Sequence, residues 1–320
     1  MTALPVRPAH LLQTLPAEQR WLIEGLWGAE AVGIVGGEPK CCKSFLALDM
    51  AVAVASATPC LRRFPVTRRG RVLLFAAEDA LSTVRQRLEG ICAAAHLRLA
   101  DLDFQVITAP TLRLDLDQDR ERLDDTVRVL RPTLLVLDPF VRLHRVDENV
   151  SAEVAPLLDY LRGLQRHHQT AVVLVHHARK GAAHLRAGQA LRGSSELHAW
   201  GDSNLYLRRT GEGDVLSLAI EHRAAASSEG TNLRLVAQDD ALALHADEPQ
   251  SLVPASSQPP PPTAIDRIEA ALAAADSPLS MKAIRAAVRM RAATVSDALA
   301  TLVTQGRVHH SATGYLLASP

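Results

Sequence analysis

The sequence has few of the features that mark membrane proteins or disulfide-rich secreted proteins. It has four cysteines and no C-x-x-C pair, so neither a disulfide framework nor a zinc site of the usual ligand spacing is expected. No apolar run approaches the roughly 20 residues that a membrane-spanning helix needs. The amino-terminal stretch MTALPVRPAH lacks the apolar core of a signal peptide. We therefore expect a cytoplasmic protein with no membrane partner.

The sequence also lacks any excess of charge of one sign. Its formal net charge is zero, so bulk charge argues neither for nor against a nucleic-acid partner, and only local patches can do so. Aromatic residues make up 3% of a chain that is otherwise rich in alanine, leucine and valine. A length of 320 residues predicts a core domain with a small accessory domain.

The most informative feature that is present is a short apolar run, Ala31 to Val35, which leads through a glycine pair and a polar loop to Lys43-Ser44. An amphipathic helical pattern follows at once, and this order is typical of a phosphate-binding loop. Lys43 is expected to reach the β- and γ-phosphates of ATP, and the Ser44 hydroxyl to hold Mg²⁺. The expected nucleotide-binding residues are Gly37, Glu38, Pro39, Lys40, Cys41, Cys42, Lys43, Ser44 and Phe45.

One residue of this loop departs from the usual pattern G-x-x-x-x-G-K-[S/T]. Cys42 stands where the second glycine is expected, at a position where backbone and phosphate approach closely and the backbone dihedral can be strained. Cysteine is small enough to be tolerated there at some loss of affinity. Cys41 and Cys42 have two interpretations, as thiols activated by the helix N-terminus or as small buried residues, and the second is favoured.

The order of apolar and helical segments predicts an α/β fold. Unbroken apolar runs separated by helical patterns indicate a mostly parallel sheet buried on both faces. After Asn204 the strands follow one another closely and read as antiparallel additions at one edge. Residues 1–28 are expected to form a helical segment that covers the first strand. The predicted parallel strands are 31–35, 72–76, 104–108, 134–138 and 171–175.

The chain is predicted to consist of an α/β domain with the phosphate loop over 1–248, a Pro-rich linker over 249–262 and a small domain over 263–320. The last of these reads as three helices and a β-hairpin, the order of a winged helix-turn-helix. Arg289 and Arg291 place positive charge between its second helix and its third, the element that commonly enters the major groove of DNA. A winged helix used for protein contacts is the alternative, because the excess of positive charge is modest.

Carboxylates follow two of the predicted strands and suggest hydrolytic chemistry. Asp138 ends its strand, where a carboxylate facing the phosphate loop is the expected Mg²⁺ partner. Glu78 and Asp79 follow the strand 72–76, and we favour Glu78 as the group that orients and deprotonates the attacking water. The alternative is that this pair only supplies favourable charge to the first turn of the next helix.

Other candidate residues are a histidine, a basic loop and an arginine at a strand end. His176 follows the strand 171–175 and is the candidate sensor of the γ-phosphate, although a lone histidine is more often structural. The segment 178–195 has no acidic residue and suits either a DNA backbone or an ordinary solvated loop. Arg223 ends a strand and could reach a neighbouring subunit's γ-phosphate, or be a plain surface arginine. The basic residues of the loop are Arg179, Lys180, Arg186 and Arg192.

Together these segments resemble the RecA-like P-loop ATPases of the plasmid RepA helicase family, which are related to the DnaB-type hexameric replicative helicases. The resemblance rests on GIVGGEPKCCKSFLAL, VLLFAAED, LLVLDPF, VVLVHHARK and LRGSSELHAWGDSNLYL. It implies a ring, usually of six subunits, with ATP between neighbours and single-stranded DNA in a central channel. The implied roles are Lys43 and Ser44 in the phosphate loop, Glu78 as catalytic glutamate, Asp138 at Mg²⁺, His176 as γ-phosphate sensor and Arg223 as the arginine finger in trans. Around Arg223 a basic partner expected two residues earlier is Glu221 here.

The resulting prediction is an oligomeric, Mg²⁺- and ATP-dependent DNA motor whose small domain recruits duplex DNA or a partner. The first alternative is a nucleotide-switched DNA-binding regulator or accessory ATPase that does not unwind DNA. The second is a structural protein that has lost nucleotide chemistry. The presence of Lys43, Ser44, Glu78, Asp138 and His176 argues against it.

Overall fold

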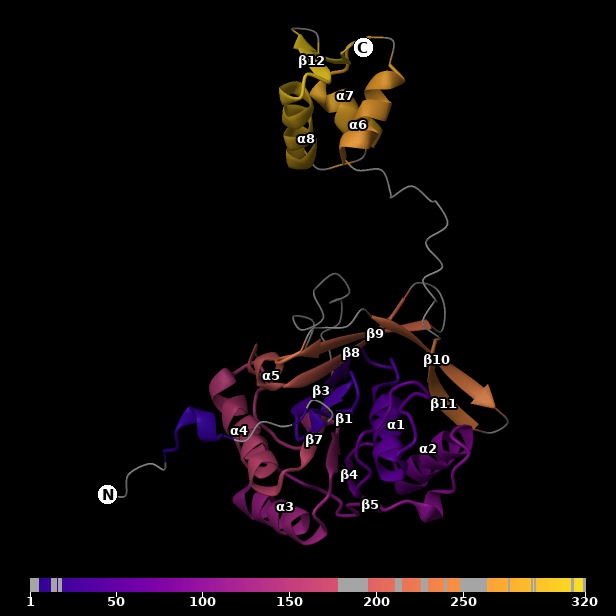
Figure 1. Ribbon diagram of the computed structural model, residues 1–320, viewed down its shortest axis with the longest axis vertical. Helices are drawn as coiled ribbons and strands as arrows, with labels where there is room; N and C mark the ends of the chain where they lie inside the picture. The colour runs from indigo at the N-terminus through magenta and orange to yellow at the C-terminus, as the bar shows by residue number, and fades with distance from the viewer. Residues whose placement is uncertain are drawn as a thin grey trace. The chain divides into compact units, whose positions relative to one another are not determined.

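The protein divides into two compact units, Met1–Pro249 and Gln250–Pro320, each of which is considered by itself (Figure 1). The structure is a computed structural model. It describes residues 6–12, 16, 19–177, 195–210, 215–225, 230–238, 241–247, 264–275, 277–288, 290, 292–311 and 314–318.

The first unit is built on a nine-stranded sheet in the order β11-β10-β9-β8-β3-β7-β6-β4-β5. Strands β3 to β8 pair in parallel, and β9, β10 and β11 continue the sheet in antiparallel fashion. This is the predicted mixture of a parallel sheet and antiparallel edge strands. The strands are β3 (Val32–Gly37), β4 (Val72–Ala76), β5 (Phe104–Val106), β6 (Leu134–Asp138), β7 (Ala171–His177), β8 (Ser203–Arg209), β9 (Val215–His222), β10 (Thr231–Gln238) and β11 (Ala241–Ala246).

Helices cover both faces of the parallel strands (Figure 1). Because side chains alternate along a strand, Val136 packs toward α1 and α2, whereas Leu135 packs toward α3 and α4. Each face of the sheet therefore has its own apolar core. An unbroken apolar strand contributes alternate side chains to the two cores. The helices are α1 (Lys43–Ser56), α2 (Leu81–Ala94), α3 (Asp117–Leu130), α4 (Ser151–His168) and α5 (Ser195–Trp200), with 3-10 turns η1 (Ala9–Leu11), η3 (Leu99–Asp101) and η4 (Phe140–Arg142).

Strand β3 lies unusually close to β8. A Cβ atom added at Gly33 would lie 1.7 Å from the carbonyl oxygen of Ser203, so no side chain fits there. The backbone N–H of Ile34 also donates to the Asn204 side chain at 3.2 Å. These contacts hold β8, and with it the antiparallel strands β9 to β11, against β3, the strand that leads into the phosphate loop.

The segment before β3 differs from the prediction of a helix through residue 28. It forms a two-stranded antiparallel hairpin, β1 (Trp21–Ile23) and β2 (Trp27–Gly28). Gly25, at the turn, has a φ of 67°, a left-handed conformation that glycine adopts without steric cost and that ends a helix. Leu22, Ile23, Leu26 and Trp27 of the hairpin are buried, and the spacing of these apolar residues resembles that of one face of a helix.

The second unit has three helices and a hairpin in the predicted order. Its core is formed by residues such as Ile268, Ile284 and Leu299, and its hairpin pairs Val308 with Leu317. The elements are α6 (Ala264–Ala273), α7 (Met281–Val288), α8 (Ala292–Thr304), β12 (Val308–Ser311) and β13 (Gly314–Leu317). Among the described residues of both units, no helix is long and apolar enough to span a membrane.

Candidate functional site

A pocket of about 240 Å³ lies where the carboxyl ends of β3, β6 and β7 meet the segment after β4. Clefts at the carboxyl ends of parallel strands are where ligands bind in open α/β sheets. The pocket is lined by Lys40, Cys41, Cys42, Lys43, Ser44, Phe45, Glu78, Arg87, Asp138, Val175 and His177. The structure thus brings the phosphate loop together with Glu78 and Asp138, as the sequence predicts.

Lys43 lies at the centre of the loop and is only 5% exposed. Its Nζ donates a hydrogen bond to the carbonyl oxygen of Glu38 at 2.7 Å and lies 3.9 Å from the Cys41 sulfur. Burial lowers the pKa of the Lys43 ammonium, while the nearby Cys41 and Asp138 act in the opposite direction. A buried ammonium group with few anionic neighbours is suited to an incoming phosphate group.

Cys42 caps the N-terminus of α1 in the left-handed conformation, with φ 62° and ψ 25°. This is the conformation that non-glycine residues adopt only at a cost, which explains why the motif has glycine at this position. Lys40, two residues earlier, also has a φ of 62°. Arg209, at the end of β8, donates to the Lys40 carbonyl oxygen at 3.1 Å and supports the loop from outside.

The two loop cysteines have different surroundings. Cys41 is 1% exposed, and burial raises the pKa of its thiol although Lys43 lowers it. Cys41 is therefore a small buried residue, not an activated thiol. Cys42 is half-buried, packs against the α1 side of the core and lines the pocket.

Asp138 ends β6 and accepts a hydrogen bond from the Ser44 hydroxyl. The pKa of Asp138 is raised to about 6, mainly by burial and also by the charges of Asp79 and Glu78, while the Ser44 hydrogen bond and the charge of Lys43 act in the opposite direction. A raised pKa among neighbouring carboxylates indicates that added positive charge would stabilise the ionised form. Hydroxyl and carboxylate oxygens are ligands that Mg²⁺ prefers, so Ser44 and Asp138 fit this ion.

Glu78 and Asp79 lie between β4 and α2, ahead of the first helical residue, Leu81. The Nε atom of Arg142 donates to Glu78 Oε1 at 2.8 Å. Asp79 is paired instead with Arg87 of α2, whose guanidinium lies 5.3 Å from the centre of the Phe45 ring. The two carboxylates are thus held by different arginines, and only Glu78 lines the pocket.

The structure places His177, not His176, at the pocket. Strand β7 continues two residues beyond the predicted end, so His177 shares the face of Val175 and His176 points to the other side of the sheet. His176 is 1% exposed, and its ring centre lies 6.1 Å from that of Phe140. Burial lowers the pKa of His177, and the charge of Lys43 lowers it further, so its neutral form is favoured.

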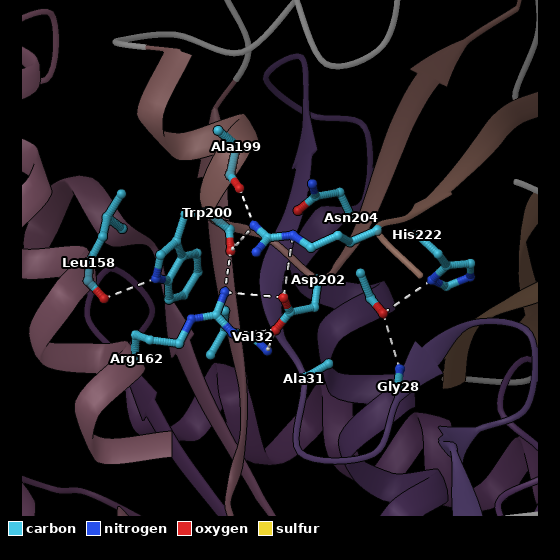
Figure 2. A network of polar contacts seen from close by, with 12 residues as sticks. Gly28, Ala31, Val32, Leu158, Arg162, Ala199, Trp200, Asp202, Asn204 and His222 are labelled. Atoms are coloured by element: carbon cyan, nitrogen blue, oxygen red, sulfur yellow. Dashed lines mark hydrogen bonds and ion pairs between the residues drawn. The ribbon is translucent and has the colours of Figure 1, made fainter. Parts of the chain in front are cut away.

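Arg223 lies at the opposite end of the sheet from the phosphate loop, because β9 runs antiparallel to β8 and Ser203 pairs with His222. Its guanidinium donates to the carbonyl oxygens of Ala199 and Trp200, the latter at 3.2 Å. These contacts join the polar network around Asp202 in Figure 2. In its own chain, Arg223 therefore does not contribute to the nucleotide pocket, and its action on a neighbouring subunit stays a prediction.

The remaining predicted DNA-binding residues lie outside the described residues; they are Arg179, Lys180, Arg186, Arg192, Arg289 and Arg291. Two residues near the site have no signal in the sequence. Arg87 and Arg142 belong to no spacing pattern, and only the fold brings them to Asp79 and Glu78.

Comparison with known proteins identifies the family of this chain and shows which solved structures share its fold. A family model described as "AAA domain" matches residues 2–183. A crystal structure of the RadB recombinase shares 16% identity, with 65% of this chain and 88% of that chain covered and a TM-score of 0.47. A structure of a DnaB-like replicative helicase and its interactions with primase shares 13% identity and a TM-score of 0.50. That match covers 67% of this chain and 57% of the helicase chain, and at such identity it shows a common RecA-like fold.

Proposed function

The chain belongs to the AAA domain family, and on this premise we propose that it is an ATP-hydrolysing DNA motor of the RepA-like kind. In this proposal it acts as a ring-shaped helicase or translocase of a plasmid or mobile element. The observation that carries the proposal is the convergence of Lys43, Ser44, Asp138, Glu78 and His177 on one pocket. That set contains the parts that phosphoryl transfer to water requires.

Each residue has a separate task in the proposed reaction. Lys43, already at the centre of the loop, stabilises the negative charge of the β- and γ-phosphates. Glu78 orients the attacking water and accepts its proton. His177 lines the same pocket and, in its neutral form, donates a hydrogen bond to the γ-phosphate. Bound Mg²⁺, held by Ser44 and Asp138, would neutralise charge on the phosphate oxygens.

The proposed motor requires parts from neighbouring copies and from DNA. Arg223 projects at the sheet end away from its own pocket, so it suits an arginine finger that acts in trans within a ring, hexameric by the resemblance. The basic segment that follows β7 would contact single-stranded DNA in the channel. The three helices and hairpin of the second unit would recruit duplex DNA or a partner protein.

A second candidate is a nucleotide-switched DNA-binding regulator or accessory ATPase that does not unwind DNA. The observation that favours it is Cys42, whose side chain lines the pocket at the glycine position of the motif. A side chain at this point of closest approach would slow turnover without abolishing binding, which suits a switch better than a motor.

Steady-state ATP hydrolysis with and without DNA separates the two candidates. The motor predicts turnover that rises strongly with single-stranded DNA, strand displacement on a forked duplex, and loss of both in Lys43→Ala. The regulator predicts slow hydrolysis that single strands leave unchanged, and binding to duplex DNA that depends on ATP. Equal ATPase and DNA binding in wild type and Lys43→Ala would reject both.

A further inference from the structure

The end of β7, which brings His177 to the pocket, is held differently on its two sides. On one side, β3 pairs with β7 as far as the pair of Gly37 with His177. On the other side, the pairing of β6 with β7 ends at Leu137 with Leu174, three residues before β7 ends. Backbone pairing therefore fixes one side of the last three residues of β7, and side-chain contacts hold the other.

These contacts come from a buried cluster on the face of β7 opposite to His177. We call it the Glu148 cluster, and it consists of Phe140, His144, Glu148 and His176. The ring centre of Phe140 lies 4.5 Å from that of His144 and 6.1 Å from that of His176. Glu148 Oε1 lies 3.5 Å from His144 Nε2 and 3.9 Å from His176 Nδ1. The cluster thus joins the end of β7 to the segment between η4 and α4.

The charge of Glu148 makes this contact more than packing. Its side chain is 11% exposed, and those of His144 and His176 are 2% and 1% exposed. A carboxylate taken out of water costs free energy unless a compensating charge lies beside it, and a proton on either imidazole supplies that charge. The attraction is stronger in such buried surroundings than in water. The carboxylate therefore holds the His176 ring, and with it the backbone of β7, in place.

The position of His176 determines that of His177 because the two residues are neighbours in one strand. Their side chains point to opposite faces, so a contact on the His176 ring sets the orientation of the His177 ring at the pocket. A displacement of about 1 Å in a group that acts on the reacting atoms can lower the rate about a hundredfold. Contacts outside the pocket can therefore control what His177 does within it.

We propose that Glu148 is a positioning residue, which acts through His176 to hold His177 toward the γ-phosphate of bound ATP. Glu148 is not among the residues that line the pocket, so it acts without touching the nucleotide. This inference rests on the proposed function, because it takes the γ-phosphate as the partner of His177. It adds that the preference of the site for ATP over ADP depends on a buried carboxylate outside the pocket.

The test measures the ratio of the Kd of ADP to the Kd of a non-hydrolysable ATP analogue, with Mg²⁺, on the full-length protein. Glu148→Gln removes the charge and keeps the volume. It is expected to lower the ratio about three- to tenfold, which is part of what a hydrogen bond to a charged group contributes. Its Kd for ADP should stay within about twofold of wild type, because the phosphate loop is unchanged.

Glu153→Gln is the matched control. Glu153 is exposed and accepts a hydrogen bond from the backbone N–H of Asp147 at 2.9 Å, so it contacts the same segment without contacting the imidazoles. Its ratio should equal that of wild type. If Glu148→Gln does not fold, Glu148→Asp takes its place. Glu148→Asp keeps the charge but withdraws it from His176, and it should also lower the ratio.

A double-mutant cycle with His177→Ala separates positioning from general loosening of the fold. If Glu148 acts through His177, then adding Glu148→Gln to His177→Ala should leave the ratio unchanged, because residues that act as a unit are not additive. The kcat for ATP hydrolysis should follow the same pattern. A merely structural role would instead lower the ratio or kcat by the same factor with and without the His177 side chain.

A wild-type ratio in Glu148→Gln would overturn the proposal, and so would an equal loss of affinity for both nucleotides or an additive effect in the cycle. Other variants separate this inference from the proposed function. If Lys43→Ala abolishes hydrolysis and His177→Ala lowers the ratio while Glu148→Gln does not, only this inference fails. If Lys43→Ala hydrolyses ATP as well as wild type, the proposed function fails, and if His177→Ala keeps the wild-type ratio, the role of His177 and this inference fail together.

Discussion

Replacing Cys42 with glycine is expected to change folding stability and nucleotide binding for two separate reasons. The backbone of Cys42 already has a φ of 62° when no nucleotide is bound. The strain of this conformation therefore lowers the free energy of unfolding. It does not change ATP affinity, because the free and the bound protein carry it equally. Affinity is reduced only by the side chain, which lines the pocket beside Lys43. Glycine would remove both effects at once.

The size of the stability effect follows from the local backbone. A left-handed residue other than glycine costs about 1–2 kcal/mol. Glycine itself lowers the free energy of unfolding by about 0.4–1 kcal/mol, because it gives the unfolded chain more freedom. The sulfur of Cys42 also packs partly on the core, so Cys42→Gly is expected to gain between 0 and about 1 kcal/mol.

The other end of α1 offers a matched control. Ala57, the C-cap, has a φ of 65°, is exposed and lies far along the helix from the pocket. Ala57→Gly relieves the same strain with no packing to lose, so its free energy of unfolding should rise by about 1 kcal/mol. Its KM for ATP should equal that of wild type. Cys42→Gly should lower the KM by up to about fivefold, equivalent to about 1 kcal/mol.

Urea denaturation gives the free energies of unfolding, and titration with a fluorescent ATP analogue gives the affinities. The reasoning is refuted if Cys42→Gly loses more than about 1 kcal/mol while Ala57→Gly gains. It is equally refuted if both variants bind the analogue as wild type does, because the Cys42 side chain would then leave the phosphates unaffected.

Three further predictions follow from the placement of single residues. His177→Ala should lower kcat for ATP hydrolysis about a hundredfold with little change in stability. His176→Ala should instead lower the free energy of unfolding by about 2–4 kcal/mol. Similar kcat values in the two variants would contradict the placement of His177, not His176, at the pocket. Burial lowers the pKa of His222 below its usual 6.5, although the Gly25 carbonyl raises it, so the unfolded chain binds more protons below about pH 6.5. The free energy of unfolding should therefore fall between pH 7 and pH 5.5, and His222→Gln should reduce that fall; an equal fall in both proteins would refute this cause. Gly33→Ala should cost about 3 kcal/mol or more in urea denaturation because of the 1.7 Å approach to Ser203, while Gly163→Ala, with nothing within 4 Å in α4, should gain about 0.5–1 kcal/mol; equal effects would reject the close packing of β3 on β8.

The central sheet could be predicted because its strands are buried on both faces. The runs 72–76 and 134–138 match β4 and β6 residue for residue, since every side chain in them must be apolar apart from the final aspartate. The hairpin at residues 21–28 could not be predicted in this way. Its buried residues Leu22, Ile23, Leu26 and Trp27 have the spacing of a helix, and only the turn at Gly25 argues for strands.

The candidate site was predictable to the extent that its parts have fixed spacing. The sequence Lys43-Ser44 after a strand, and carboxylates at two strand ends, identify the pocket because parallel strands bring their carboxyl ends together. Which of His176 and His177 faces the pocket depends on how far β7 extends, because neighbouring residues of a strand point to opposite faces of the sheet. Arg87 and Arg142 reach the carboxylates through helix placement and a turn, for which the sequence carries no periodic signal.

The central claim is that this chain hydrolyses ATP in the pocket around Lys43, and steady-state hydrolysis by wild type and Lys43→Ala tests it most directly. Lys43 is buried and bonded within its own loop, so a control of melting temperature shows whether the variant remains folded. The account predicts that folded Lys43→Ala loses hydrolysis at least a hundredfold, on the order of removing a group that stabilises transition-state charge. Hydrolysis at the wild-type rate by the folded variant would contradict it.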